Sequence, residues 1–256
     1  MHYRRNFLTK VIVRLDFDPV PALRDLVQTD PPPPFSARIA QQFPVVRGQG
    51  TQTLAVSIGP TGTGVQQEVA GVIWGHRRVE NGTQVVVLAP EYLAIEYGRN
   101  DFDHFPPLRA HAALALDALA AEYPRENFKR LGLRYVNEIV LPQGNPLDWG
   151  GLLDPNLITS AKAGTGEGDA IIRSMHQLIL RNGEYRTALN YGLFNPDYPN
   201  ALARRQFVLD FDCSRMGPFP AAEALAALDG ANARCETLFE RSIADGLRDI
   251  MEIINE

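Results

Sequence analysis

Apolar and polar residues alternate over much of this 256-residue chain with a period of two, which is typical of half-buried β-strands. The segment 11–18 alternates in this way after its first residues and ends in Leu-Asp-Phe-Asp. Similar runs predict further strands at 45–58, 69–79, 84–88, 92–97, 128–141, 170–181, 185–194 and 206–212. Asn81-Gly82 and Asn182-Gly183 separate two pairs of these runs and predict tight hairpins, because both residue types tolerate positive φ.

Two segments have the spacing of an amphipathic helix. Residues 103–123 place Phe105, Leu108 and Leu119 on one face, and Pro124 ends the helix. Residues 231–254 predict a second long helix, with a shorter one at 220–228 and an interruption at Asp229-Gly230 between them.

Strand meanders that are each followed by a long helix predict an α+β fold with mainly antiparallel sheet and two long amphipathic helices. Each half of the chain holds one Leu-Asp-Phe-Asp strand, one Asn-Gly hairpin and one long helix, which leaves open an alternative of two similar halves. The division is an N-terminal half at 1–142, a flexible loop at 143–169 and a C-terminal half at 170–256. Gly164–Gly168 is the part of that loop with the most glycine.

Composition narrows the class of protein. Hydrophobic residues make up 45% of the chain, charged residues 21%, and the net charge is -5, so no general field attracts nucleic acid or an anionic membrane. Only two cysteines occur, and no Cys/His cluster has the spacing of a zinc site. No signal core or membrane-length apolar run is visible, so we expect a soluble cytoplasmic protein without a membrane partner.

The repeated Leu-Asp-Phe-Asp is the first candidate for chemistry. Alternation places Asp16 and Asp18 on one strand face, and Asp210 and Asp212 on one face of the other. If the two strands were neighbours, the four carboxylates could hold Mg²⁺ for phosphoryl or nucleotide chemistry. The alternative is that the acidic faces are solvated or paired with arginines. No other cofactor is evident.

The second candidate is a polar segment on the strand at 128–141. Basic residues beside an aromatic can bind single-stranded nucleic acid, and an irregular polar set on a long strand indicates a hydrogen-bonded network or a binding face. The binding candidates are Lys129, Arg130, Arg134, Tyr135, Asn137 and Glu138. Further basic pairs extend the nucleic-acid alternative, namely Arg4-Arg5, Arg77-Arg78 and Arg204-Arg205.

Established catalytic motifs are missing from the sequence. It has no Gly-Lys-Ser/Thr phosphate loop, no Gly-x-Ser-x-Gly elbow and no His-Glu-x-x-His. This absence favours a non-enzymatic binding or accessory protein, most simply one with a protein partner. Nucleic acid as the partner and a homo-oligomer remain open.

Three segments together resemble a known group of proteins. They are the opening His2–Leu8 with the strand that follows, the segment Lys129–Ile139 containing Arg-Leu-Gly-Leu-Arg-Tyr-Val-Asn-Glu, and the closing helical segment. The chain resembles, nearly end to end, a sporadically distributed family of uncharacterised bacterial proteins of about this length. The resemblance implies a bacterial source, and its scattered distribution implies a mobile gene set for defence or a toxin–antitoxin-like system. It supplies no catalytic residues.

Overall fold

The computed structural model describes residues 3–59, 62–163 and 170–254, and in these ranges the fold is α+β with one nine-stranded sheet. The sheet order is β2-β3-β4-β5-β1-β6-β9-β8-β7, and every pair of neighbours is antiparallel. The strands are β1 (Leu8–Asp16), β2 (Val45–Gly59), β3 (Gly62–Arg77), β4 (Val85–Leu88), β5 (Tyr92–Gly98), β6 (Asn127–Leu141), β7 (Ser174–Asn182), β8 (Tyr185–Leu193) and β9 (Arg205–Pro220). The helices are α1 (Pro21–Arg24), α2 (Pro34–Ile39), α3 (Phe105–Glu122), α4 (Pro155–Ala163), α5 (Ala224–Ser242) and α6 (Asp245–Met251).

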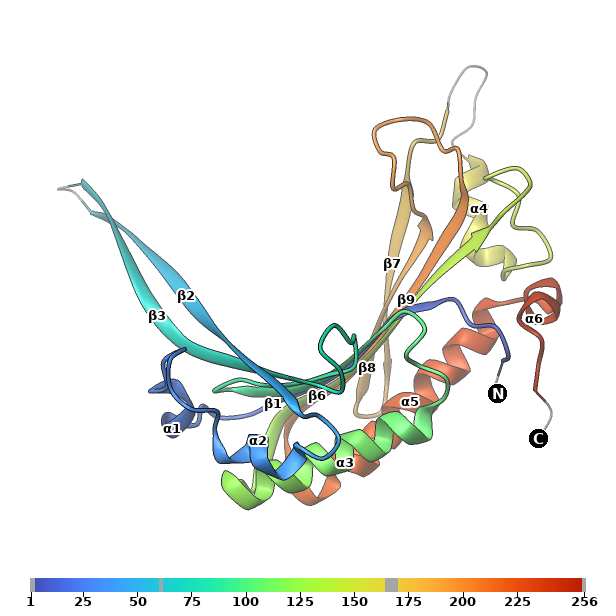
Figure 1. The fold of residues 1–256 in the computed structure, drawn as a ribbon. Coiled ribbons are helices and arrows are strands. Elements are labelled where there is room, and N and C mark those ends of the chain that lie inside the picture. The colour runs from blue at the N-terminus through green and yellow to red at the C-terminus, as the bar shows by residue number, and fades with distance from the viewer. Residues whose placement is uncertain (1–2, 60–61, 164–169, 255–256) are drawn as a thin grey trace.

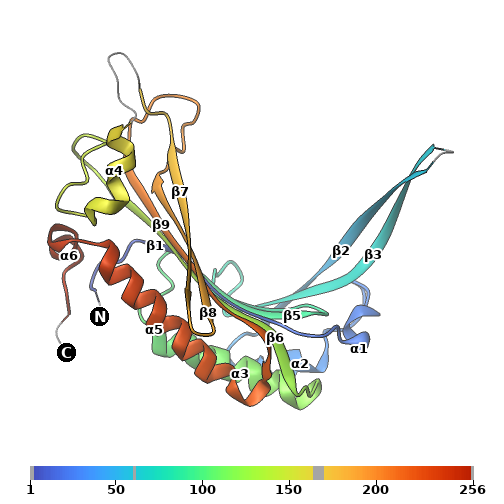
Figure 2. The same ribbon diagram turned by 180° about the vertical axis from the view of Figure 1, so that it is seen from behind.

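The sheet is strongly curved, and its two sides are covered differently. Figures 1 and 2 show α3 and α5 lying along the convex side, with the β2–β3 hairpin rising at one end of the sheet and β7 at the other. In the described ranges, no helix lies across the concave side (Figure 1). No helix in those ranges is long and apolar enough to cross a membrane.

The core lies between the convex side and its helices. Val13 of β1, Leu133 of β6 and Leu209 of β9 are fully buried there, since alternate residues of each strand point toward α3 and α5. Leu108 and Ala112 of α3 are also fully buried, which confirms the apolar face predicted for that helix.

A hairpin forms at both Asn-Gly pairs, but only one has the predicted tight turn. Asn182 ends β7 and pairs with Tyr185, so Gly183 and Glu184 alone form the turn into β8. Asn81-Gly82 instead lies within a longer connection, 78–84, between β3 and β4, and neither residue has positive φ. Gly183 has a φ of +57°, the left-handed conformation that glycine adopts without steric cost.

The helical prediction for the C-terminal part requires correction. α5 runs through Asp229-Gly230 without interruption, and Gly230 lies so close to the Tyr185 ring that a Cβ there would clash with the phenol oxygen. The predicted long helix at 231–254 instead ends at Ser242, where Ile243 becomes extended and forms a β-bridge with Leu153. Within the described residues there is therefore one long helix, which a 3₁₀ turn extends to 221–242, rather than two.

The predicted organisation in halves finds no support in the fold. β6 of the proposed first half lies directly beside β9 of the second, in the same sheet as β1. The loop predicted at 143–169 contains a helix, α4, and Gly164–Gly168 lies outside the described residues. The boundaries at 142 and 170 stay a prediction.

A buried histidine anchors the base of the β2–β3 hairpin. His76 lies between the Ser36 hydroxyl of α2, 2.8 Å from Nε2, and the Val86 carbonyl, 3.1 Å from Nδ1. Burial lowers the pKa of His76 to about 4. The folded protein therefore holds this imidazole neutral, with Nδ1–H donating to Val86 and Nε2 accepting from Ser36.

This environment predicts acid sensitivity. The unfolded chain binds the proton more tightly, so stability from His76 is complete above the ordinary pKa of 6.5 and is lost as the pH falls toward 4. We expect His76 alone to lower the free energy of unfolding by about 3 kcal/mol over that range. Urea unfolding at a series of pH values will show a shallower acid slope in His76→Gln. An unchanged slope in that variant, or an equal change in the exposed control His104→Gln, would contradict this account.

Candidate functional site

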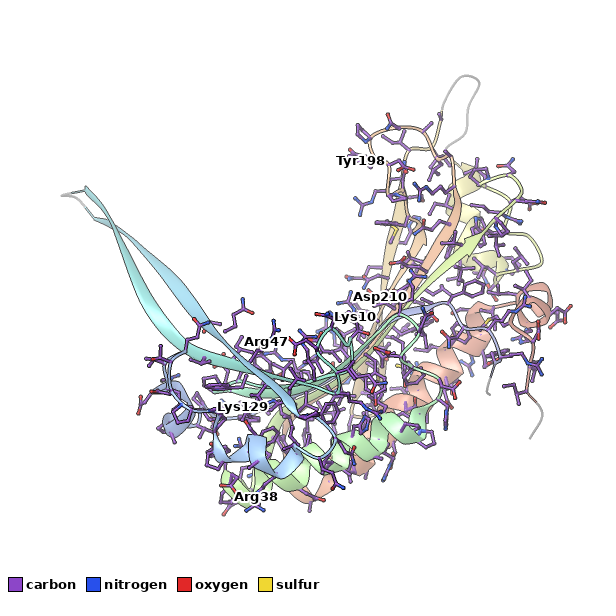
Figure 3. All side chains as sticks on the ribbon, viewed as in Figure 1. Lys10, Arg38, Arg47, Lys129, Tyr198 and Asp210 are labelled. Carbon is purple, nitrogen blue, oxygen red and sulfur yellow. The ribbon has the colours of Figure 1, made fainter. Side chains whose placement is uncertain are left out.

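The concave side of the sheet carries a lattice of paired charges. Directly opposed residues of antiparallel strands share a face, so Ile12, Arg134 and Asp212 form one row across β1, β6 and β9. Figure 3 shows Lys10 and Asp210 on this concave side. We call the concave side of β5, β1, β6, β9, β8 and β7 the open face.

Two arginines of β6 hold the open face together. Arg134 Nε and Nη2 each donate to an Asp210 carboxylate oxygen at 2.8 Å, a bidentate pair. The Asp210 side chain is only 8% exposed, and Asn190 of β8 also donates to it at 3.2 Å. The hydrogen bonds to Asp210 raise the pKa of Arg134. Arg130 reaches both Leu-Asp-Phe-Asp strands, with Nη1 3.5 Å from Asp16 and Nη2 3.4 Å from Asp212.

The four aspartates proposed as metal ligands therefore face arginine and lysine side chains. β1 and β9 lie on opposite sides of β6, about 10 Å apart at the usual strand spacing. Asp16 also pairs with Arg14 at 2.7 Å, and Asp18 pairs with Lys129. Among the described residues, no group of three or more His, Cys, Asp or Glu side chains could hold a metal ion.

Two further ion pairs lie on the open face, whereas Arg181 of β7 and Arg186 of β8 oppose each other there without an acidic partner among the described residues. Glu138 of β6 accepts from Arg99 at 3.1 Å, and Lys10 contacts Glu96 at 3.1 Å. Exposed apolar side chains interrupt this lattice. Val140, Ile179 and Met216 are 44%, 48% and 57% exposed, and their strand positions place them on the open face.

The basic pairs outside β6 are engaged with acidic or carbonyl oxygens. Arg4 and Arg5 both contact Glu252. Arg204 pairs with Asp197, and Arg205 donates to the backbone carbonyl of Asp148. Arg77 and Arg78 donate to the Gly82 carbonyl and the Gln84 side chain.

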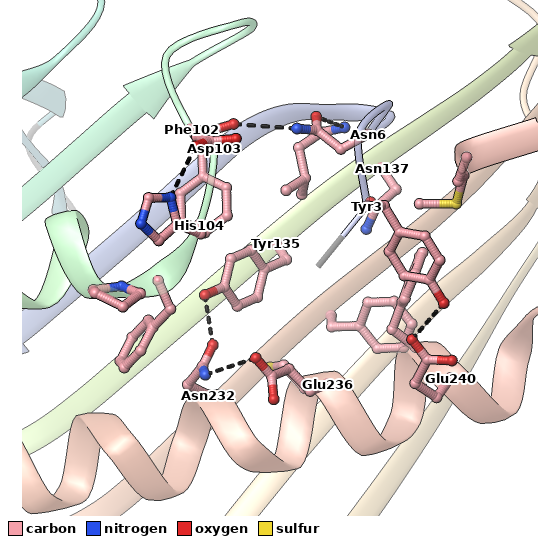
Figure 4. A pocket seen from close by; sticks show the side chains of 17 residues that line it. Tyr3, Asn6, Phe102, Asp103, His104, Tyr135, Asn137, Asn232, Glu236 and Glu240 are labelled. Atoms are coloured by element: carbon pink, nitrogen blue, oxygen red, sulfur yellow. Dashed lines mark hydrogen bonds and ion pairs between the residues drawn. The ribbon is translucent and has the colours of Figure 1, made fainter. Parts of the chain in front are cut away.

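A pocket of about 410 Å³ opens on the convex side, between β6 and α5 (Figure 4). The N-terminal segment before β1 and the loop that leads into α3 complete its walls. Six aromatic side chains contribute to the lining: Tyr3, Phe102, Phe105, Tyr135, Phe211 and Phe239. The aromatic walls make this pocket suited to a ligand with an apolar body.

Hydrogen bonds run from the floor of the pocket to its rim. The buried Tyr135 hydroxyl donates to Asn232 at 2.7 Å, and Asn232 donates to the Glu236 carboxylate at 3.1 Å. Tyr3 donates to Glu240 at 2.7 Å, and burial together with Glu240 raises the pKa of Tyr3. Burial also raises the pKa of Tyr135, so its hydroxyl stays protonated and keeps donating.

The binding segment predicted on β6 is therefore divided between two sites. Arg130, Arg134 and Glu138 lie on the open face, whereas Tyr135 and Asn137 line the pocket on the other side of the strand. Lys129 pairs with Asp18 near the start of β6. The pocket residues of α5, above all Asn232 and Glu236, were not predicted. Their helical spacing on the polar edge of the predicted stripe is the one signal that could have found them.

Searches against protein-family models, curated proteins and solved structures found no match for this chain.

The Arg134–Asp210 pair predicts a measurable contribution to stability. Arg134→Met leaves the Asp210 carboxylate buried without its guanidinium, so we expect the free energy of unfolding to fall by about 2–3 kcal/mol in urea unfolding. The double variant Arg134→Met/Asp210→Leu should recover most of that loss, because neither charge is then buried alone. The exposed ion pair between Lys10 and Glu96 offers a control. Lys10→Met should lower the free energy of unfolding by less than about 1 kcal/mol. If Arg134→Met and Lys10→Met lowered the free energy of unfolding equally, the Arg134–Asp210 pair would make no special contribution to stability.

Proposed function

We propose that this protein is a non-enzymatic binding or accessory protein that recognises a protein partner on the open face of its sheet. The observation that carries the proposal is the unequal covering of the sheet. Helices pack on the convex side alone in the described ranges, and the concave side presents paired charges with exposed Val140, Ile179 and Met216 between them. A surface with ordered polar groups and scattered apolar contacts is suited to a protein surface of complementary shape.

Charge pairing favours a protein over nucleic acid. A nucleic-acid surface needs unneutralised cations for phosphate groups, and binding then weakens steeply with salt. Here Arg130 and Arg134 are committed to aspartates, and the net charge of the chain is -5. These arginines therefore present a locally balanced charge.

The same pairing disfavours the Mg²⁺-dependent enzyme as the second candidate. A shared metal requires carboxylates that converge on one point, whereas Arg130 lies between Asp16 and Asp212. The resemblance to sporadically distributed bacterial proteins supports placing the protein in a mobile defence or toxin–antitoxin-like gene set, as an accessory that binds another component. Cytoplasmic action is part of this proposal.

Photocrosslinking tests the proposed surface. A benzophenone amino acid at Met216 or Ile179, in lysate of the organism that encodes the chain, should give a discrete adduct with one protein. The same amino acid at Thr237, exposed on α5, is the matched control and should not give that adduct. Adducts from Thr237 alone would place recognition on the helical side and overturn the proposal. Steep loss of the adduct with added salt, together with nuclease sensitivity, would favour nucleic acid.

A metal titration separates the two candidates. Because Asp16, Asp210 and Asp212 are occupied by arginines, we expect Mg²⁺ and Mn²⁺ to leave the melting temperature unchanged. A ligand that binds only the native state must raise that temperature. A rise that disappears in Asp16→Asn/Asp210→Asn would instead support the enzyme.

A further inference from the structure

We propose that the pocket between β6 and α5 binds an organic cation, a protonated or methylated amine attached to an apolar body. This inference goes beyond the proposed function and does not depend on it, since the pocket lies on the convex side of the sheet and the proposed partner surface on the concave side.

The walls of the pocket are suited to a cation. Phe102 meets Tyr135 edge to face at 5.5 Å between ring centroids, and Tyr3 and Phe211 each meet Phe239 in the same way at 6.3 Å. Aromatic faces carry partial negative charge and attract ammonium groups that have left water. Together these rings make an apolar enclosure that favours an ammonium group over a carboxylate or phosphate.

The rim supplies formal negative charge. The carboxylates of Asp103, Glu236 and Glu240 all line the pocket. The described lining contains no lysine or arginine, and its histidine, His104, contacts Asp103 at 2.9 Å. Glu240 is held by Tyr3 and by Arg248, which lies outside the lining. Glu236 accepts from Asn232, and among the described residues no cation pairs with it. Glu236 is therefore the carboxylate best placed to pair with a bound ammonium.

The floor is neutral and rigidly hydrogen-bonded. Asn137 is 4% exposed and donates to the Leu209 carbonyl at 3.2 Å, and Tyr135 is 8% exposed and donates to Asn232. The Cys235 thiol also lines the pocket, and its hydrogen bond with Cys213 and its burial raise its pKa. The floor therefore offers hydrogen bonds but no charge, which leaves charge recognition to the rim.

The size of the pocket limits the ligand. A volume of about 410 Å³ lies in the range of small-molecule sites, which runs from about 300 to 1,000 Å³. It accommodates a ring with a short alkyl chain and an ammonium group. A ligand of this shape places its ring among the aromatic walls and its ammonium at Glu236.

β6 connects this pocket with the open face. Tyr135 and Asn137 line the pocket, whereas their neighbours Arg134 and Glu138 carry the charge lattice. A ligand in the pocket would therefore contact β6, the same strand whose Arg134 and Glu138 form ion pairs on the open face.

The test is calorimetric titration of the full chain with three probes that share one body, phenylbutylamine, phenylbutanol and phenylbutyrate. We expect the amine to bind about tenfold more tightly than the alcohol, because a charge-assisted pair with Glu236 adds to the common apolar contact. The carboxylate should bind more weakly than the alcohol. Equal binding of the three probes, or no binding by any at millimolar concentration, would overturn the proposal.

Two variants locate the effect. Glu236→Gln retains the acceptor for Asn232 but removes the charge, so the affinity for the amine should fall to that of the alcohol, with the alcohol unchanged. Glu91→Gln, the same change at an exposed position between β4 and β5, should leave the preference intact. Leu8→Trp, which fills the pocket at its half-buried edge, should abolish binding of all three probes while thermal melting reports a folded protein. An amine preference that survives Glu236→Gln, or full binding to folded Leu8→Trp, would refute the site.

Discussion

The structure depends on β6, which packs apolar side chains into the core on one side and forms ion pairs with its neighbouring strands on the other. On one side its leucines fill the core beneath α3 and α5, and on the other Arg130 and Arg134 hold the aspartates of β1 and β9. Asp210 is almost completely buried, so its carboxylate is tolerable only with the bidentate guanidinium beside it. The pairing fixes the register of three central strands, because a slip of one residue would turn every charge into the core.

Helices cover only the convex side of the nine-stranded sheet in the described ranges. The concave side must therefore be stabilised by the side chains of its own strands. The charge lattice does this without helices and keeps the concave side available to a partner. On the convex side, α5 and the segment before β1 stand apart from β6 far enough to leave a pocket with aromatic walls. Recognition of a protein and binding of a small cation are thus proposed on opposite sides of one strand.

Local signals in the sequence predicted much of the sheet. Alternation predicted β1, β6 and the first part of β9, and Asn182-Gly183 predicted the tight β7–β8 hairpin, since these features depend on neighbours in the chain. The end of α5 was missed because it depends on a bridge between Ile243 and Leu153, which are distant in sequence. The Leu-Asp-Phe-Asp strands were recognised, but not that β6 lies between them with its arginines. The pocket is lined by four segments that are distant in sequence: the segment before β1, the loop before α3, β6 and α5. A local sequence pattern cannot predict that these segments meet.

The central claim is that the open face is the recognition surface, and side-chain blocking tests it most directly. Cys213 and Cys235 are buried, so a cysteine introduced at exposed Val140 can be labelled selectively. A bulky maleimide on Val140→Cys should abolish recovery of the crosslinked partner, and the same label on Thr237→Cys should leave recovery unchanged. Full recovery with the open face blocked, and loss with α5 blocked, would contradict the account.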